Sequence, residues 1–166
     1  LHGAQFAGFA NVSRGVSVGG QFAGFANAHV GNLKGIQAAG FINIANKMKG
    51  MQVGLINISD SLRGGPLGLF SYSRKGYHAW EMSGNDFVQA NVGYRTGTKG
   101  LYNIYNAGVR VDGDRHWYSF GLGFGTRLAF GKKWSLNLGG TTSFISDLTA
   151  SAALSFLNIA GLDLEY

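Results

Sequence analysis

Six charged side chains are the residues of this sequence whose types and predicted placement could most readily do chemistry. Alternating strand patterns place them on one face together with small residues: Arg95, Arg110, Arg127, Glu81, Asp163 and Glu165. If the strands close around a lumen, these charges either pair across it and plug it, or line an aqueous path that selects anions. Pairing is the favoured interpretation, because a narrow interior must compensate its charges, and the three carboxylates are the expected partners of the arginines.

Signals for an enzyme or a metal site are weak. His78 and Glu81 lie three residues apart in a predicted strand, so they point to opposite faces and do not readily share a metal ion. Residues 112–114 read Asp-Gly-Asp, which predicts a turn between two strands rather than a calcium site, since further oxygen ligands are lacking. The chain has no cysteine and none of the common phosphate-binding or hydrolase motifs. We therefore expect no catalytic residue, no cofactor and no metal.

The composition is that of a β-rich chain. The 166 residues include 28 glycines and one proline, and 13% are charged, which fits neither a disordered segment nor a helical bundle. Strands with small residues on one face and large apolar residues on the other are typical of outer-membrane barrels. The length predicts one β domain, residues 1–166, with repeat strands at 3–76 and a meander at 77–166.

The formal net charge is +6, and the basic residues lie mainly in predicted turns: Lys34, Lys47, Lys49, Arg63, Arg74, Lys75, Lys99, Lys132 and Lys133. Turns are normally solvated, so ordinary solubility explains this placement. The alternative is a functional basic rim that meets anionic lipid or polysaccharide. Nucleic acid is not an expected partner, because no nucleic-acid-binding motif is present.

One phrase recurs five times in the first half of the chain. The copies read GFAN, GFAN, GFIN, GLIN and GLFS, at 8–11, 24–27, 40–43, 54–57 and 68–71. Their glycines are separated by 16, 16, 14 and 14 residues. Because a two-residue insertion in a turn preserves strand facing, each unit is interpreted as one strand plus one turn. Period-two sorting then predicts one face with Gln21, Ala23, Phe25 and Asn27, opposite Phe22, Gly24, Ala26 and Ala28.

Two architectures explain the repeat. In a parallel β-solenoid the units stack as coils, the basic turns form a ridge along one edge, and a ladder is formed by Asn27, Asn43 and Asn57. In an up-and-down barrel each unit is one membrane-length strand of roughly 9 to 11 residues. The repeat alone favours the solenoid slightly.

Longer alternating segments in the second half favour the barrel. Residues 117–130 place Phe120, Leu122 and Phe124 on a bulky apolar face, opposite mainly small residues. Residues 134–144 alternate in the same way, and GKK at 131–133 is predicted to join the two segments as a hairpin. The small, weakly polar face suits a narrow lumen better than the outer face of a soluble sandwich. Lipid is therefore the predicted solvent of the bulky face.

The two ends of the chain are consistent with an envelope protein. Leu162, Leu164 and Tyr166 alternate with two acids in a last strand that resembles the aromatic-ending terminal strand of outer-membrane barrels. The chain starts at Leu1 without a basic segment followed by an apolar stretch, which suggests a processed or truncated sequence. No run of about 18 apolar residues is present, so a transmembrane helix is not expected.

Residues 35–81 and 94–110 resemble a family of surface-repeat proteins of Bacteroidetes and Leptospira. The likeness lies in the phrase G-x-Q-x-x-G-[FL]-x-N and in a later segment that reads RTGTKGLYNI here. The resemblance covers most of the chain. It implies an envelope location and carries over no catalytic or binding residue.

The sequence thus predicts an all-β, mainly antiparallel up-and-down barrel of about 10 to 12 strands, with the repeats as its first five strands. The expected location is the bacterial outer membrane or cell surface. The expected function is non-enzymatic, as a porin-like small pore or a structural component of an envelope complex, with outer-membrane lipid and envelope proteins as partners. The alternative is a surface-exposed module in which residues 3–76 form a parallel solenoid, followed by an antiparallel sheet, and bind glycan or protein.

Overall fold

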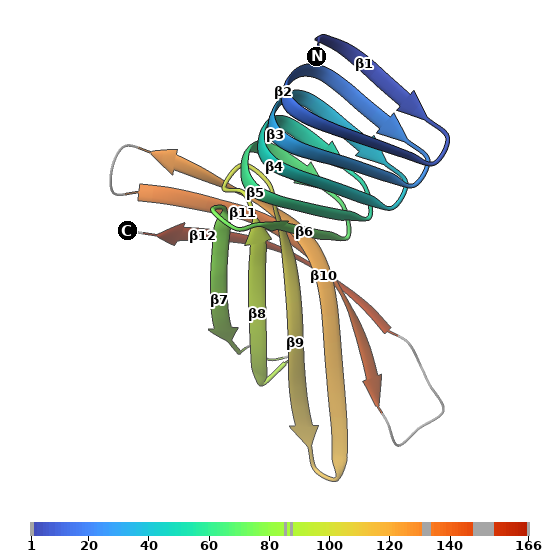
Figure 1. The fold of residues 1–166 in the computed structure, drawn as a ribbon. Helices are drawn as coiled ribbons and strands as arrows, with labels where there is room; N and C mark the ends of the chain where they lie inside the picture. Colours follow the sequence, from blue (N-terminus) through green and yellow to red (C-terminus); the bar gives the residue numbers. More distant parts are fainter. Residues whose placement is uncertain (1, 85, 87, 131–133, 148–154, 166) are drawn as a thin grey trace. The chain divides into compact units, whose positions relative to one another are not determined.

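The computed structural model is all-β and describes residues 2–84, 86, 88–130, 134–147 and 155–165. Its strands form two six-stranded sheets, in the orders β1-β2-β3-β4-β5-β6 and β12-β11-β10-β9-β8-β7 (Figure 1). The strands are His2–Ala7 (β1), Ala10–Ala23 (β2), Ala26–Ala39 (β3), Ile42–Val53 (β4), Ile56–Leu67 (β5), Phe70–Ser73 (β6), Tyr77–Ser83 (β7), Ala90–Gly97 (β8), Tyr102–Asp112 (β9), Arg115–Phe130 (β10), Trp134–Asp147 (β11) and Ser155–Glu165 (β12). The described part of the chain has no helix that is long and apolar enough to cross a membrane.

The chain divides into two compact units, and each is described by itself. The first comprises Leu1–Tyr77 and Thr96–Tyr102, and the second comprises His78–Arg95 and Asn103–Tyr166. The first boundary lies where the sequence repeat ends.

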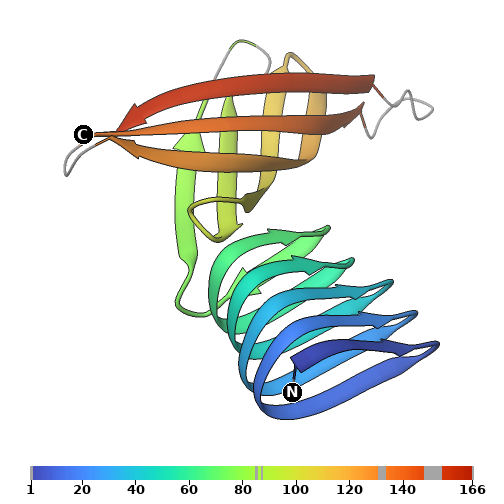
Figure 2. The same cartoon turned by 90° about the horizontal axis from the view of Figure 1, so that it is seen from above.

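The repeat region folds as a parallel β-solenoid. Strands β1 to β6 pair in parallel, so equivalent residues lie side by side, as Asn27 does between Asn11 and Asn43. Figure 2 shows these coils stacked in sequence order from the N-terminus. The prediction that the repeats form antiparallel barrel strands is therefore wrong, and the alternative solenoid is confirmed. Even spacing fixes which face a residue takes but not the strand direction, and parallel stacking sets identical amides against each other.

Two ladders of amide side chains fill the solenoid interior. In one, each Nε2 donates to the Oε1 of the preceding coil over 2.8–2.9 Å, through Gln52, Gln37, Gln21 and Gln5. In the other, each Nδ2 donates to the Oδ1 of the following coil over 3.0 Å, through Asn11, Asn27, Asn43 and Asn57. The predicted asparagine ladder is thus confirmed. Because buried polar groups must be hydrogen-bonded, the ladders fix the register of the coils.

Each asparagine also ties together the two legs of its own coil. Nδ2 of Asn27 donates to the carbonyl of Ala38 over 2.8 Å, and Nδ2 of Asn43 donates to that of Val53 over 2.8 Å. An apolar cluster completes the interior and is formed by Leu33, Ala45, Met48 and Leu62. The interior is therefore a mixture of paired amides and a narrow apolar column.

The coils bend sharply at the glycine of each GFAN phrase. Phe25, which follows Gly24 in the bend, is exposed, whereas Gln21 and Asn27 are buried. The predicted period of two across this unit is therefore wrong, because the bend changes the face that each position takes. A Cβ atom at Gly24 would overlap the carbonyl oxygen of Gly8 in the preceding coil, so only glycine fits there.

The number of residues per coil falls from 16 to 14 in two steps of one residue each. The register between β3 and β4 shifts at an irregularity between His29 and Asn32. After it, Ala38 pairs with Val53 at an offset of 15, and the next coil pairs at an offset of 14. The expected two-residue change in one turn is thus two one-residue changes, of which the irregularity accounts for the first. The interior amides stay buried through both changes, as Gln37, Asn43 and Gln52 show.

Residues of the segment Thr96–Tyr102 close the β6 end of the solenoid unit, to which they belong. Thr96 Oγ1 donates to the carbonyl of Ser71 over 3.1 Å, and Thr98 Oγ1 donates to that of Gly64 over 2.7 Å. Capping of this kind protects the last coil of a solenoid. The β6 end is therefore capped by the chain itself.

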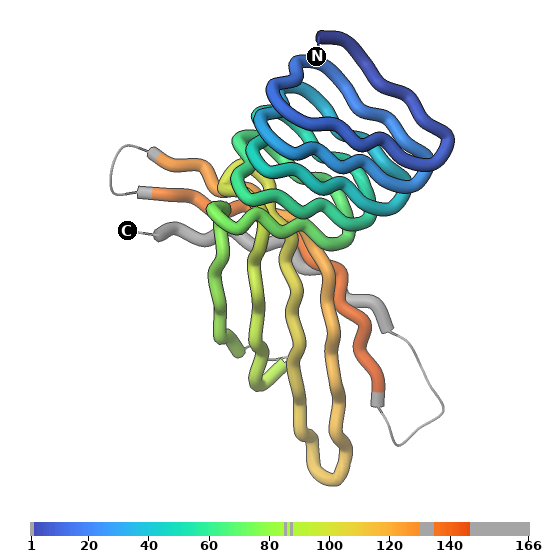
Figure 3. The backbone as a smooth tube through the Cα atoms, viewed as in Figure 1, coloured from blue at the N-terminus to red at the C-terminus, as the bar shows by residue number. Residues whose placement is uncertain are grey.

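The second unit is an antiparallel sheet, whose backbone is traced in Figure 3. Strands β10 and β11 form the predicted hairpin with Phe130 opposite Trp134, and β12 pairs antiparallel with β11. The predicted turn at 112–114 is confirmed between β9 and β10, while that at 131–133 lies outside the described residues. The two strand orders contain no pair that closes either sheet within the described residues, so the predicted closed barrel is not observed.

Replacing Asn43 by alanine is expected to lower the free energy of unfolding by about 2–4 kcal/mol, because neighbouring amide and carbonyl groups lose partners in a buried site. Asn43 is 0% exposed. The control is Asn46→Ala, at an exposed position of the same strand, which is expected to change stability by less than about 0.5 kcal/mol. Urea unfolding followed by circular dichroism measures both, and equal effects would contradict a structural role for the ladder.

Candidate functional site

Basic side chains from three successive coils form one row on the outer surface of the solenoid. Lys34 in β3 pairs in register with Lys49 in β4, and Lys49 pairs with Arg63 in β5. All three residues are exposed. Adjacent strands lie about 4.8 Å apart, so the row presents one cation per rung. We call Lys34, Lys49 and Arg63 the basic row.

The basic row borders a groove of about 510 Å³. Lys47 adds a fourth cation to its lining, and exposed apolar side chains are contributed by Val16 and Val18. The groove therefore offers positive charge and apolar surface together. Such a lining suits a ligand that has both anionic groups and apolar faces.

The solenoid unit carries almost no negative charge. Residues 1–77 and 96–102 contain eight Lys and Arg residues and one acid, Asp60. Asp60 pairs with Arg74 and Lys75, and the hydrogen bond from Arg74 holds the pKa of the Asp60 carboxyl below its ordinary value. Among the described residues, no acid forms an ion pair with the basic row. The row is therefore a source of uncompensated positive potential.

An aromatic ridge lies where the coils bend. Phe9, Phe25 and Phe41 stack along successive coils, with centroids 5.0–5.1 Å apart and ring planes within 10° of parallel. Because the rings cover one another's faces, they present mainly their edges to the outside. A sugar that packs on an aromatic ring needs the ring face, so this ridge is an apolar surface rather than a platform for sugars.

In the antiparallel sheet the large apolar side chains lie on an exposed face. Phe120 and Phe124 are 52% and 42% exposed, whereas Gly121 and Gly125 are buried. Leu122 is half-buried. No layer of described residues in this unit covers the bulky face.

The structure brings together two of the six charges singled out from the sequence. Arg95 forms an ion pair with Glu81, and the Arg95 side chain is 11% exposed. Arg127 donates from Nη2 to Ser135 Oγ over 2.8 Å. The side chains of Asp163 and Glu165 lie outside the described residues. A lumen role for these charges stays a prediction.

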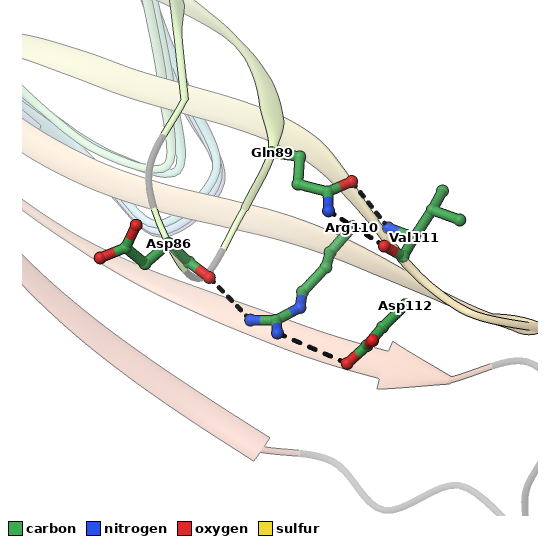
Figure 4. A network of polar contacts seen from close by, with 5 residues as sticks. All are labelled: Asp86, Gln89, Arg110, Val111 and Asp112. Carbon is green, nitrogen blue, oxygen red and sulfur yellow. Dashed lines mark hydrogen bonds and ion pairs between the residues drawn. The ribbon is translucent and has the colours of Figure 1, made fainter.

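Arg110 takes part in a local network at one end of β9 (Figure 4). Its Nη1 donates to the carbonyl of Asp86 over 2.7 Å, and its Nη2 lies 3.5 Å from Asp112 Oδ2. Beside it, Gln89 exchanges two hydrogen bonds with the backbone of Val111, of 3.0 and 3.1 Å. The acid found beside Arg110 was not among its predicted partners, because the sequence pattern places Asp112 in a turn.

His78 contacts aromatic neighbours. Its Nδ1 lies 3.1 Å from the hydroxyl of Tyr94, and Trp80 packs on the same tyrosine with 4.7 Å between ring centroids. In the part of the chain that the structure describes, no group of three or more His, Cys, Asp or Glu side chains could hold a metal ion.

The spacing of the basic row was visible in the sequence. Lys34, Lys49 and Arg63 are 15 and 14 residues apart, which are coil lengths, so parallel stacking predicts that they align. A ridge of basic residues is therefore present, as expected for a solenoid. The prediction that these residues lie in turns is wrong, because Lys34, Lys49 and Arg63 lie within strands β3, β4 and β5. The groove beside it was not predicted, because its lining depends on how the coil bends.

Comparisons with known proteins add nothing to this description. The chain matches no protein-family model, no curated protein and no solved structure.

The substitution Lys49→Gln is expected to stabilise the solenoid, because like charges opposite each other on neighbouring strands repel. The expected gain is about 0.2–1 kcal/mol at low ionic strength, and it fades as salt screens the charges. Lys99→Gln, at an exposed lysine outside the row, is the control. Urea titrations at low and high salt measure both variants, and a destabilised Lys49→Gln chain at low salt would contradict the repulsion.

Proposed function

We propose that the chain is a non-enzymatic β-solenoid binding module of the bacterial cell surface that binds an anionic glycan along its basic row. The observation that carries this proposal is the in-register alignment of Lys34, Lys49 and Arg63 on three successive coils. A regular row of cations suits a polymer whose charges also recur, because linked contacts form together and reinforce one another.

The lining of the groove supports a glycan as the ligand. Sugar units carry both polar groups and apolar C–H faces, and the groove combines four cations with the exposed side chains of Val16 and Val18. Stacked coils also create extended surfaces of the kind that solenoids use for binding. A small anion would engage one or two cations and gain little from the length of the row.

The charge of the free protein supports a binding role as well. Lys49 lies between two cations on neighbouring strands, an arrangement that destabilises a sheet by roughly 0.2–1 kcal/mol. An anionic polymer would relieve this repulsion when it binds. A local arrangement that lowers stability is common at functional sites, where activity and stability compete.

The surface location is part of the proposal. It is supported by the resemblance of residues 35–81 and 94–110 to surface-repeat proteins. The low charge and high glycine content also agree with an envelope protein.

A second function, as a structural component of the outer membrane, is favoured by the antiparallel sheet. Phe120 and Phe124 are exposed while Gly121 and Gly125 are buried, as expected if lipid solvates the bulky face. A role in an envelope complex, or as a small pore, is the narrower form of this function. The two functions are compatible because they use different units of the chain.

Polymer binding tests the first function, with heparin and polygalacturonate as anionic probes and dextran as the neutral control. We expect binding of both anionic polymers, weakening as salt rises, and no binding of dextran. Lys49→Gln is expected to weaken binding roughly fivefold, since one close charge contact at a surface contributes about 1 kcal/mol. Calorimetry measures the affinities, with Lys99→Gln as the matched variant. Equal affinities of the two variants would contradict the site.

Detergent-phase partitioning tests the second function. If lipid solvates the bulky face of the sheet, the full chain enters the detergent phase, and replacing Phe120 and Phe124 by serine shifts it toward the aqueous phase. The matched control replaces Phe25 and Phe41, exposed rings of the solenoid unit, by serine. A wild-type chain that stays monomeric in detergent-free buffer would exclude this function.

A further inference from the structure

The cations of the groove are arranged along the axis of the solenoid rather than along a strand. Lys34, Lys49 and Arg63 occupy equivalent positions in β3, β4 and β5. Within any one strand the groove has at most two cations, which are Lys47 and Lys49 of β4. A ligand that contacts the whole basic row must therefore cross the strands and run from coil to coil, in the direction in which the coils stack in Figure 2.

The positive charge of the groove is confined to a single line. Toward β1 the basic row ends at Val18, which pairs with Lys34 and is 38% exposed. In the neighbouring outward column, Lys47 pairs with Asn32 on one side and with Ser61 on the other, so that column carries one cation. The groove therefore presents three cations in line, with a fourth beside the middle one.

The strand spacing sets the interval at which a ligand must carry its charges. Neighbouring strands lie about 4.8 Å apart, so Lys34 and Arg63 are separated by about 9.6 Å at the backbone. Each sugar unit lengthens an extended polysaccharide by about the distance between two strands. A glycan with an anionic group on every unit therefore offers one charge to each rung, whereas a glycan with a charge on every second unit offers none to Lys49. Flexible side chains absorb a small mismatch of spacing but do not replace a missing charge.

Lys49 is the residue that distinguishes these two kinds of glycan. Its neighbours include three positive side chains, from Lys34 and Arg63 on the adjacent strands and from Lys47 on its own strand. No acid of the described residues forms an ion pair with it. A ligand without a charge opposite Lys49 leaves the repulsion among these cations in place, and a ligand with one there relieves it.

We propose that the groove selects linear polyuronates, which carry one carboxylate on every sugar unit. The glycan lies along the solenoid axis, with three consecutive units opposite Lys34, Lys49 and Arg63. The next unit toward β1 lies over Val18, whose exposed side chain offers an apolar contact to a sugar C–H face. This inference rests on the proposed function, because it names the class of anionic glycan that the module binds.

Glycans of different charge spacing test the selection. The probes are hexasaccharides of galacturonate, with a carboxylate on every unit, and of hyaluronate, with one on every second unit, and calorimetry measures their affinities for the full chain at equal salt. We expect the galacturonate to bind at least about fivefold more tightly, since it makes one more close charge contact. Equal affinities would overturn the inference and leave the proposed function standing, whereas no binding of either probe would contradict both.

The variant Lys49→Gln separates charge spacing from general attraction between opposite charges. It is expected to weaken binding of the galacturonate about fivefold, and to change binding of the hyaluronate less than about twofold, because no hyaluronate charge lies opposite position 49. Arg14→Gln removes the same charge at an exposed position of β2 outside the groove lining, and is expected to change neither affinity. An equal loss of affinity for both probes in Lys49→Gln would overturn the inference, because it would reflect only the lower net charge.

A series of oligogalacturonates of increasing length tests the extent of the site. Affinity is expected to rise steeply up to three units, one for each cation of the basic row, and to change about twofold or less with each further unit, because Val18 carries no charge. A steep rise that continues well beyond three units would contradict the placement along the row. Tighter binding of a thymidine oligonucleotide than of trigalacturonate would also overturn the inference, because a nucleic acid would then be the preferred polyanion.

Discussion

A buried primary amide needs both an acceptor and a donor, and in this solenoid the partner within reach is the identical amide one coil away. That constraint fixes the strand direction, because only parallel stacking brings like amides together. It also fixes the register, since a slip of one residue would turn an amide outward and leave its neighbour unpaired. The glutamine ladder ends where Pro66 takes the next rung, and Gln52 Oε1 has no hydrogen-bond donor there among the described residues.

Because amides fill much of the interior, many apolar and all basic-row side chains lie on the outer surface of the solenoid. The interior retains one narrow apolar cluster around Leu33 and Met48, while rings such as Phe25 and the cations of the basic row face outward. Because the coils are in register, each outward feature becomes a row with one member per rung. The basic row and the groove beside it follow from that geometry.

Local elements could be predicted from the sequence better than the way in which they pair. The repeat, the hairpin of residues 117–130 with 134–144 and the turn at 112–114 were predicted because spacing and alternation express them directly. Strand direction in the repeats was not, since parallel and antiparallel pairings share the same alternation. The predicted face of Phe25 was wrong because a bend interrupts the period of two. The groove beside Lys49 depends on backbone curvature at irregular positions, and no spacing rule reports that.

The central claim is that parallel, in-register coils are held together by their interior amides. It is tested most directly by spin-label distances along one outward row, with position 12 labelled together with position 28, 44, 58 or 72 in turn; these positions pair rung by rung. The account predicts distances that grow uniformly, by about 4.8 Å per rung. Distances that instead alternate with strand order, as antiparallel neighbours would give, would contradict it.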